Sequence, residues 1–161
     1  MAQVNHISEI EAIKLLDTYS CIDEWNMYIA NLWADTEMVT KLKSMGLSED
    51  IIVSMKLGAK KEFGKRFLSI PVFYNNMLVD IRNYNIFKYD KYPKMTSQEN
   101  AVGGWILPYK EFLESSEPCY ILEGEKDMLL ARSMGINAYT MVSGASATPN
   151  EYVINAFEGK D

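Results

Sequence analysis

The strongest constraint on the fold lies in residues 119–134, where a short apolar run leads into an amphipathic segment. The run ends at Glu123, Gly124 follows, and a second acid, Asp127, lies four residues after the first. This order is typical of a strand that turns into a helix, with both carboxylates at the carboxyl edge of a sheet. Such edges are where open α/β sheets bind ligands, and paired acids there suit divalent metals and phosphates.

Each acid also has an ordinary structural explanation. Glu123 can cap the following helix, Asp127 can stabilise the helix dipole from the first turn, and Glu125 can simply be solvated. The spacing by itself therefore leaves the catalytic and the structural interpretations both open.

A second strand is expected over residues 138–142, and the helix between the two strands makes a crossover that predicts a parallel pair. A loop of small residues follows at 143–147, and Thr148 with Pro149 predicts the start of another helix. The loop is a candidate anion site, although it lacks the glycine pattern of a phosphate-binding loop. A further strand would normally come next, so we interpret the chain as a fragment of a longer fold.

The N-terminal third predicts helices. Apolar residues recur at helical spacing after Ser8, Asp35 and Ser48, each of which is a suitable N-cap, and Gly46 and Gly58 are expected to end the second and third helices. Residues 22–33 continue the helical pattern, and their apolar positions are Trp25, Met27, Ile29 and Leu32.

The middle of the chain changes period. Two β-branched and aromatic runs, 67–74 and 77–84, flank Asn75-Asn76 and predict a hairpin in which Arg82 lies on the polar face. Residues 85–104 are polar and tyrosine-rich, and they predict a long loop or short broken strands.

These elements predict an α+β protein, with a helical and β-hairpin N-terminal subdomain followed by a partial α/β subdomain built on a parallel sheet. The expected division is a helical region at 1–58, a basic hairpin-containing region at 59–116 and the α/β part at 117–161.

Charge is distributed unevenly along the chain. The net charge is −6, yet residues 56–94 hold nine basic and three acidic side chains between two acidic flanks. This basic middle is either a solvated lysine-rich surface or a face that follows phosphates. Arg66, Arg82 and Lys94 are the candidate phosphate contacts, and the aromatic residues of 84–109 can stack bases or pack in the core.

Other functional classes are less compatible with the sequence. Cys21 and Cys119 are far apart, and no Cys/His spacing indicates a zinc site or a disulfide framework. His6 is the only histidine and is expected at the surface. There is no apolar run of membrane-spanning length and no signal-peptide pattern, so we expect a cytoplasmic protein with no membrane contact.

Taken together, the motifs resemble a known family. The segments 121–127, 135–138 and 142–145 resemble the first half of a Toprim domain, and more narrowly that of DnaG-type bacterial and phage DNA primases. Upstream and in the family's order, three segments resemble the helix before the primase core, an Arg-x-x-x-Phe-Pro-Ile-like strand and a Pro-Lys-Tyr motif: 46–58, 66–72 and 92–95. The resemblance covers roughly residues 46–161.

The resemblance implies a DNA-binding nucleotidyltransferase that makes short RNA primers from NTPs on single-stranded DNA. It implies a Mg²⁺ or Mn²⁺ cofactor and a replicative helicase as partner, either fused or separate. In this family Glu123 corresponds to the Toprim glutamate that serves in catalysis and metal binding, and Asp127 to the acid that follows it. Arg66, Arg82 and Lys94 fall in the basic elements that face the template and the nucleotide.

The sequence departs from the family pattern in two respects. The Asp-x-Asp motif of the next strand and the zinc-binding template module are both absent from these 161 residues. Because two-metal phosphoryl transfer requires several carboxylates, we expect this chain alone to be inactive. Two alternatives remain: a Toprim nuclease or topoisomerase, and a non-catalytic phage or mobile-element protein that binds nucleic acid or a replication partner.

Overall fold

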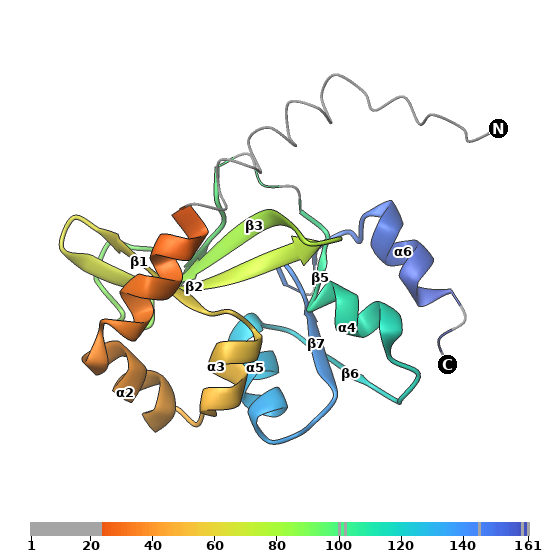
Figure 1. The fold of residues 1–161 in the computed structure, drawn as a ribbon. Coiled ribbons are helices and arrows are strands. Elements are labelled where there is room, and N and C mark those ends of the chain that lie inside the picture. Colours follow the sequence, from red (N-terminus) through yellow and green to blue (C-terminus); the bar gives the residue numbers. More distant parts are fainter. Residues whose placement is uncertain (1–23, 100, 102, 145, 159, 161) are drawn as a thin grey trace.

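The computed structural model describes residues 24–160 apart from 100, 102, 145 and 159. The expected helix after Ser8 and the positions of His6 and Cys21 lie outside this range. Figure 1 shows two sheets side by side: one is accompanied by the N-terminal helices and the other by the C-terminal helices. The described residues thus confirm the α+β class.

Three helical segments pack beneath the first sheet. They span residues 24–33, α2 (Thr36–Ser44) and α3 (Glu49–Ser54). The predicted caps are present, since Asp35 accepts a hydrogen bond from the Met38 amide and Ser48 from the Ile51 amide. In the helix that precedes Asp35, the apolar positions Trp25 and Leu32 are buried, but Met27 is exposed and its neighbour Tyr28 is buried in its place.

The first sheet has the strand order β1-β2-β3-β4 and is antiparallel throughout. Its strands are β1 (Gly58–Glu62), β2 (Lys65–Tyr74), β3 (Met77–Tyr84) and β4 (Met95–Thr96). The hairpin at Asn75-Asn76 is confirmed, and both residues have the positive φ that its two-residue turn requires, 47° and 63°.

The strand β1 was not predicted. Gly58 does not end α3, as predicted, but begins β1, and a side chain there would meet the Tyr28 Cβ at 2.8 Å. The close approach of β1 to the first helix therefore requires glycine at this position. The strand could not be predicted from its sequence, GAKKE, because it has too few hydrophobic residues to show the alternation of apolar and polar side chains that is typical of a strand.

The hairpin also differs from prediction in its faces. Ile81 and Arg82 point to opposite faces of β3, and both are buried, with 1% and 8% exposure. The prediction that Arg82 lies on a solvated face is therefore wrong. The reason is that α5 (Glu125–Ser133) supplies Arg82 with a buried partner, Glu125.

The second sheet has the order β5-β7-β6. The strands are β5 (Ile106–Leu107), β6 (Tyr120–Leu122) and β7 (Ala138–Met141). The predicted crossover is confirmed, because β6 and β7 are parallel and α5 connects them. However, β5 pairs antiparallel with β7, so the sheet is mixed and not purely parallel. The chain passes from the first sheet to the second between β4 and β5.

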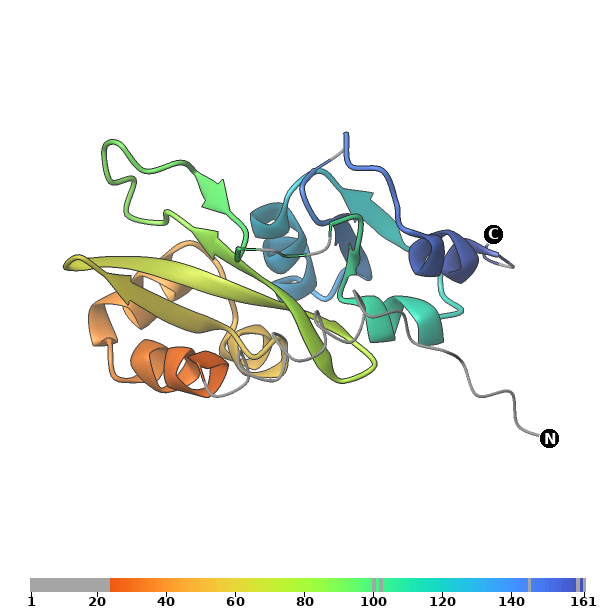
Figure 2. The same cartoon turned by 90° about the horizontal axis from the view of Figure 1, so that it is seen from above.

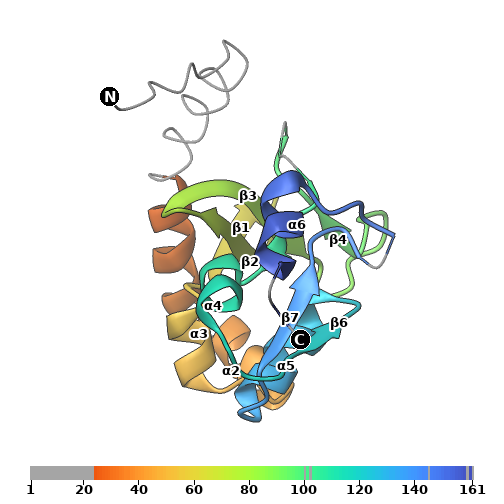
Figure 3. The ribbon, with the colours of Figure 1, turned by 90° about the vertical axis from the view of Figure 1, so that its right-hand side faces the viewer.

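Two further helices, α4 (Tyr109–Glu114) and α6 (Glu151–Phe157), accompany this sheet. Figure 3 shows both of them beside β7. The N-cap of α6 is Asn150, which accepts a hydrogen bond from the Val153 amide, and not Thr148 as predicted.

The larger of two hydrophobic core clusters connects the two sheets, and the smaller one packs the first helix against β3. The larger cluster contains Leu68 and Ile70 from the first sheet, Ile106 and Tyr139 from the second, and Met128 from α5. In Figure 2, α5 lies between the two sheets, so it is one of the elements that join them. No helix among the described residues is long and apolar enough to cross a membrane.

Candidate functional site

The acid-bearing turn connects β6 to α5. Gly124 is the N-cap of α5 and has an extended backbone (φ −135°, ψ 154°). Because glycine has no side chain, the cap residue accepts no hydrogen bond from the first amides of the helix through a side chain. Of the three acids around this cap, Glu123 and Asp127 are exposed, whereas Glu125 is only 6% exposed. The two acids predicted to carry the chemistry therefore face solvent, at the positive end of the α5 dipole.

Packing on either side holds this turn in place. Met128 and Leu129 anchor α5 in the core, and the Thr140 hydroxyl donates to the Leu122 carbonyl at 2.8 Å, which ties β7 to the end of β6. At Gly124 an added Cβ would lie 3.9 Å from Oδ2 of Asp127, so that carboxylate folds back over the cap.

The small-residue loop after β7 reaches the same place. Ser143 and Gly144 both have positive φ, 78° and 86°, and a Cβ at Gly144 would lie 4.0 Å from the Glu123 carbonyl oxygen. Because β6 and β7 are parallel, the segments that follow them meet at one sheet edge. The turn and the loop thus meet at the predicted sheet edge and together form the candidate site.

Arg82 reaches this site from the other sheet. Its Nε donates to Oε1 of Glu125 at 2.8 Å, and the two side chains are 10% and 7% exposed. Arg82 was predicted to face the template and the nucleotide; in the structure it lies beside the acid-bearing turn, and its guanidinium is paired with a protein carboxylate.

The ion pair belongs to a longer network. Nη1 of Arg82 donates to the Ser97 hydroxyl, which in turn donates to Oδ2 of Asp80 at 2.8 Å. The Gln98 amide donates to Oδ1 of the same carboxylate at 3.0 Å. Asp80 is 1% exposed, and this burial raises the pKa of its carboxyl, with the hydrogen bonds and Arg82 opposing the shift. The network links β3, the segment after β4 and the first turn of α5.

Arg66 lies in the other half of the first sheet. Its Nη1 contacts Asp35 at 3.1 Å and Glu37 at 2.9 Å, and its guanidinium lies over the Phe87 ring. The hydrogen bond to Glu37 is the largest cause of a raised Arg66 pKa. All of these contacts lie within residues 35–89, so the structure does not bring Arg66 to the acid-bearing turn.

Lys94 is exposed, on the loop between β3 and β4. Asn85 orders this loop: its side-chain amide donates to the carbonyls of Tyr89 and Tyr92, and its backbone amide donates to the Lys94 carbonyl. Of the three basic candidates, Lys94 alone has an exposed side chain.

Sequence reasoning missed Glu125 and Asp80. The only available signal was Glu125 itself, a third acid in the turn, and its spacing could not reveal an arginine 43 residues earlier. Within the part of the chain that the structure describes, no three acidic, histidine or cysteine side chains are arranged to hold a metal ion.

Two exposed carboxylates do fit one class of ion. Mg²⁺ binds through one or two protein carboxylates together with substrate phosphates and water. Glu123 and Asp127 are exposed and would hold such an ion only in company with other ligands.

No protein-family model matches the sequence, and no curated protein gives a significant match. Solved structures do match. The Aquifex aeolicus primase (zinc-binding and RNA polymerase domains) is 19% identical with a TM-score of 0.66, covering 90% of this chain and 45% of its own. A DnaG primase catalytic domain bound to ssDNA is 16% identical with a TM-score of 0.69, covering 92% and 62%.

A third similar structure is the RNA polymerase domain of Mycobacterium tuberculosis primase DnaG, in complex with a double-stranded DNA oligomer with a 6-nucleotide overhang. It is 10% identical with a TM-score of 0.65, covering 91% of this chain and 59% of its own. The chain thus has the fold of DnaG primase catalytic domains, which confirms the resemblance at the level of fold. It spans about half to three fifths of their length.

Proposed function

We propose that this chain is part of a DNA primase, a nucleotidyltransferase that makes short RNA primers on single-stranded DNA. The observation that carries the proposal is the pair of exposed acids, Glu123 and Asp127, at the carboxyl edge of β6 and β7 in a fold shared with primase catalytic domains. In this proposal residues 117–161 are the first half of a Toprim domain, preceded by a helical region (1–58) and a basic core region (59–116).

Each side chain has a chemical role. Glu123 and Asp127 would hold a divalent cation, Mg²⁺ or Mn²⁺, together with the nucleotide phosphates. When bound, that ion neutralises charge that develops on the transferred phosphoryl group. Lys94 would contact a phosphate as an exposed point charge. Arg66 and Arg82 are held by carboxylates and would contribute indirectly unless those ion pairs open.

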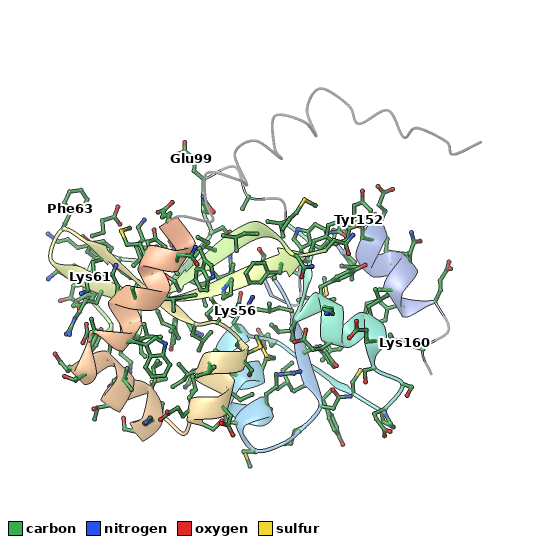
Figure 4. The ribbon with its side chains drawn as sticks, in the orientation of Figure 1. Lys56, Lys61, Phe63, Glu99, Tyr152 and Lys160 are labelled. Atoms are coloured by element: carbon green, nitrogen blue, oxygen red, sulfur yellow. The ribbon has the colours of Figure 1, made fainter. Side chains whose placement is uncertain are left out.

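The nucleic acid would lie along the two lysine-rich loops of the first sheet. The tip of the β1–β2 hairpin carries Phe63, which is 89% exposed, and Figure 4 shows Phe63 and Lys61 at this tip, directed away from the ribbon. The side chains that we assign to this contact come from the β1–β2 hairpin and from the loop between β3 and β4: Lys60, Lys61, Lys65, Lys88, Lys91 and Lys94, with Tyr89 and Tyr92. Lysines that follow a backbone and aromatic rings that stack bases are the usual elements of single-strand binding.

We propose further that the chain alone makes no primers. Two-metal chemistry requires more carboxylates than Glu123 and Asp127, and an Asp-x-Asp strand from additional polypeptide would supply them. A replicative helicase, fused or separate, is the proposed partner. The neighbouring coding sequence tests whether additional polypeptide supplies that strand: a continuation with Asp-x-Asp supports it, and a stop codon directly after residue 161 contradicts it.

The decisive experiment uses the protein encoded by the complete coding sequence. Glu123→Gln is expected to abolish incorporation of ribonucleotides on a single-stranded template with Mg²⁺, because an amide neither binds the ion nor accepts a proton as a carboxylate does. Glu117→Gln, an equally exposed acid before β6, is the matched control and is expected to retain activity.

Other results of this experiment would favour one of the alternative functions. Undiminished synthesis by the Glu123 variant would remove this residue from the mechanism. Mg²⁺-dependent nicking of supercoiled DNA, lost in the same variant and without nucleotide incorporation, would assign the nuclease or topoisomerase class. DNA binding with neither activity would assign a non-catalytic protein.

A further inference from the structure

We propose that Arg82 is a positioning residue: by binding Glu125 in the protein interior, it keeps that acid out of the site and leaves Glu123 and Asp127 facing outward. The proposal concerns the arrangement of the acid-bearing turn. Its catalytic consequence rests on the proposed function, whereas its structural consequence does not.

The first step of the argument is the burial of one acid out of three. Glu123, Glu125 and Asp127 lie at the N-terminal end of one helix, and Glu125 alone is buried. A carboxylate is not buried without a partner, because the loss of hydration costs several kcal/mol. Among the described residues, Arg82 is the one donor to the Glu125 side chain, so Arg82 accounts for the burial.

The second step is the cap. Gly124 provides no side chain to the first turn of α5, so the orientation of this turn depends on contacts made from outside the helix. The Arg82–Glu125 pair is such a contact, and it acts on the first residue of α5, one position after the cap. Residues that orient ligands in this way often matter to an ion site as much as its direct ligands do.

The third step is the anchorage of Arg82 itself. Arg82 also donates to Ser97, whose hydroxyl donates to the buried Asp80. The guanidinium is therefore held at two of its nitrogens. Through Arg82, the first turn of α5 is connected by hydrogen bonds to Ser97 and to Asp80 of β3. Arg82 thereby fixes the position of the acid-bearing turn, which follows a strand of the second sheet, relative to β3 of the first sheet.

The first measurement uses the 161-residue chain. Amide hydrogen exchange is compared between wild type, Arg82→Met and Arg132→Met. The last is the control: Arg132 lies on α5 itself, and its Nη1 donates to the Ala138 carbonyl. We expect Arg82→Met to accelerate exchange at residues 123–128 by about tenfold or more while the β2 and β3 amides stay protected. Unchanged exchange at the turn would overturn the proposal, as would an equal increase throughout the chain.

The second measurement uses charge reversal, which also covers the case in which Arg82→Met fails to fold. The double variant R82E/E125R restores an ion pair, and we expect it to return exchange at the turn toward the wild-type rate. The neutral pair R82M/E125M gives a folded reference in which neither charge is buried. If R82E/E125R folds and its turn exchanges as fast as that of Arg82→Met, the pair does not position the turn.

The third measurement is kinetic and uses the complete protein. We expect Arg82→Met to raise the Mg²⁺ concentration for half-maximal synthesis by about 10- to 100-fold with little change in the KM for NTP, and charge reversal to rescue part of the loss. A raised KM for NTP without rescue would show that Arg82 binds phosphate directly and would overturn the proposal. Absence of synthesis in the wild type would contradict the proposed function, while the exchange data still decide the positioning role.

Discussion

Arg66 and Arg82 lie on neighbouring strands of one sheet and were predicted to have the same role, yet the fold places them in different surroundings. The Arg66 side chain is 26% exposed and shares two carboxylates: that of Glu37 is 70% exposed, and that of Asp35 is 8% exposed. The Arg82 side chain is 10% exposed, and that of its partner is 7% exposed. An ion pair at the surface can rearrange at little cost, whereas breaking a buried pair leaves an uncompensated charge. Arg66 is therefore a partly exposed cation, whereas Arg82 is buried together with its partner.

The largest effect is expected at the buried pair. Arg82→Met leaves Glu125 without its donor in the interior, so the free energy of unfolding is expected to fall by roughly 3–5 kcal/mol. Urea unfolding followed by tryptophan fluorescence measures the change. The neutral double variant R82M/E125M should recover most of the loss. A decrease below about 1 kcal/mol in the single variant would place this pair with surface ion pairs and remove the contrast.

A smaller effect is expected at Arg66. Arg66→Met leaves Asp35 with the hydrogen bond that it accepts from the Met38 amide, and Glu37 is already largely in water. Because Asp35 is 8% exposed, the free energy of unfolding should fall by about 1 to 2 kcal/mol, less than at Arg82, and the difference should shrink as NaCl screens the wild-type pair. The same urea titration at low and high salt tests this. A loss as large as that at Arg82 would show that exposure does not distinguish the two sites.

Asp80 adds a pH-dependent test of the comparison, because it belongs to the buried network of Arg82 and not to the Arg66 cluster, which consists of Arg66, Asp35 and Glu37. Burial raises its pKa above the ordinary value of 3.8, so the folded chain holds this proton to higher pH than the unfolded chain does. Its contribution to the free energy of unfolding is therefore fully present below the unfolded-state pKa and decreases as the pH rises through the folded-state pKa.

Asp80→Asn removes this titration while it keeps the size of the side chain. The stability of the variant relative to wild type is expected to rise as the pH increases through that window. Urea midpoints at a series of pH values measure the trend. A difference that is constant with pH, or that falls as the pH rises, would contradict the direction of the shift.

The smallest effect on stability is expected at the tip of the β1–β2 hairpin, beyond the Arg66 cluster. Phe63→Ala should change the free energy of unfolding by no more than about 0.5 kcal/mol, because the ring is 89% exposed. If the ring stacks a base, the affinity for oligo(dT) should weaken by about 1 kcal/mol or more. Fluorescence anisotropy measures this, with Leu113→Ala, another exposed apolar residue, as the control. Equal affinities for wild type and Phe63→Ala would remove this surface from the proposed single-strand contact.

Local signals predicted much of the fold. The turn after β6, the helix that follows, the parallel β7 and the hairpin at Asn75-Asn76 all rest on residues close together in sequence. The strands that escaped prediction, β1 and β5, are a lysine-rich segment and a two-residue segment, in which periodicity has too little length or contrast to appear.

In the candidate site, too, some features follow from local sequence and others from tertiary contacts. The sequence by itself determined where Glu123 and Asp127 lie, at a strand end and in the first turn of a helix, since strand, glycine and helix occupy a single short run. Only the tertiary structure decided that Glu125 turns inward and that Arg82 is not free for phosphate. These two side chains are 43 residues apart, and their contact exists only because α5 packs between the two sheets.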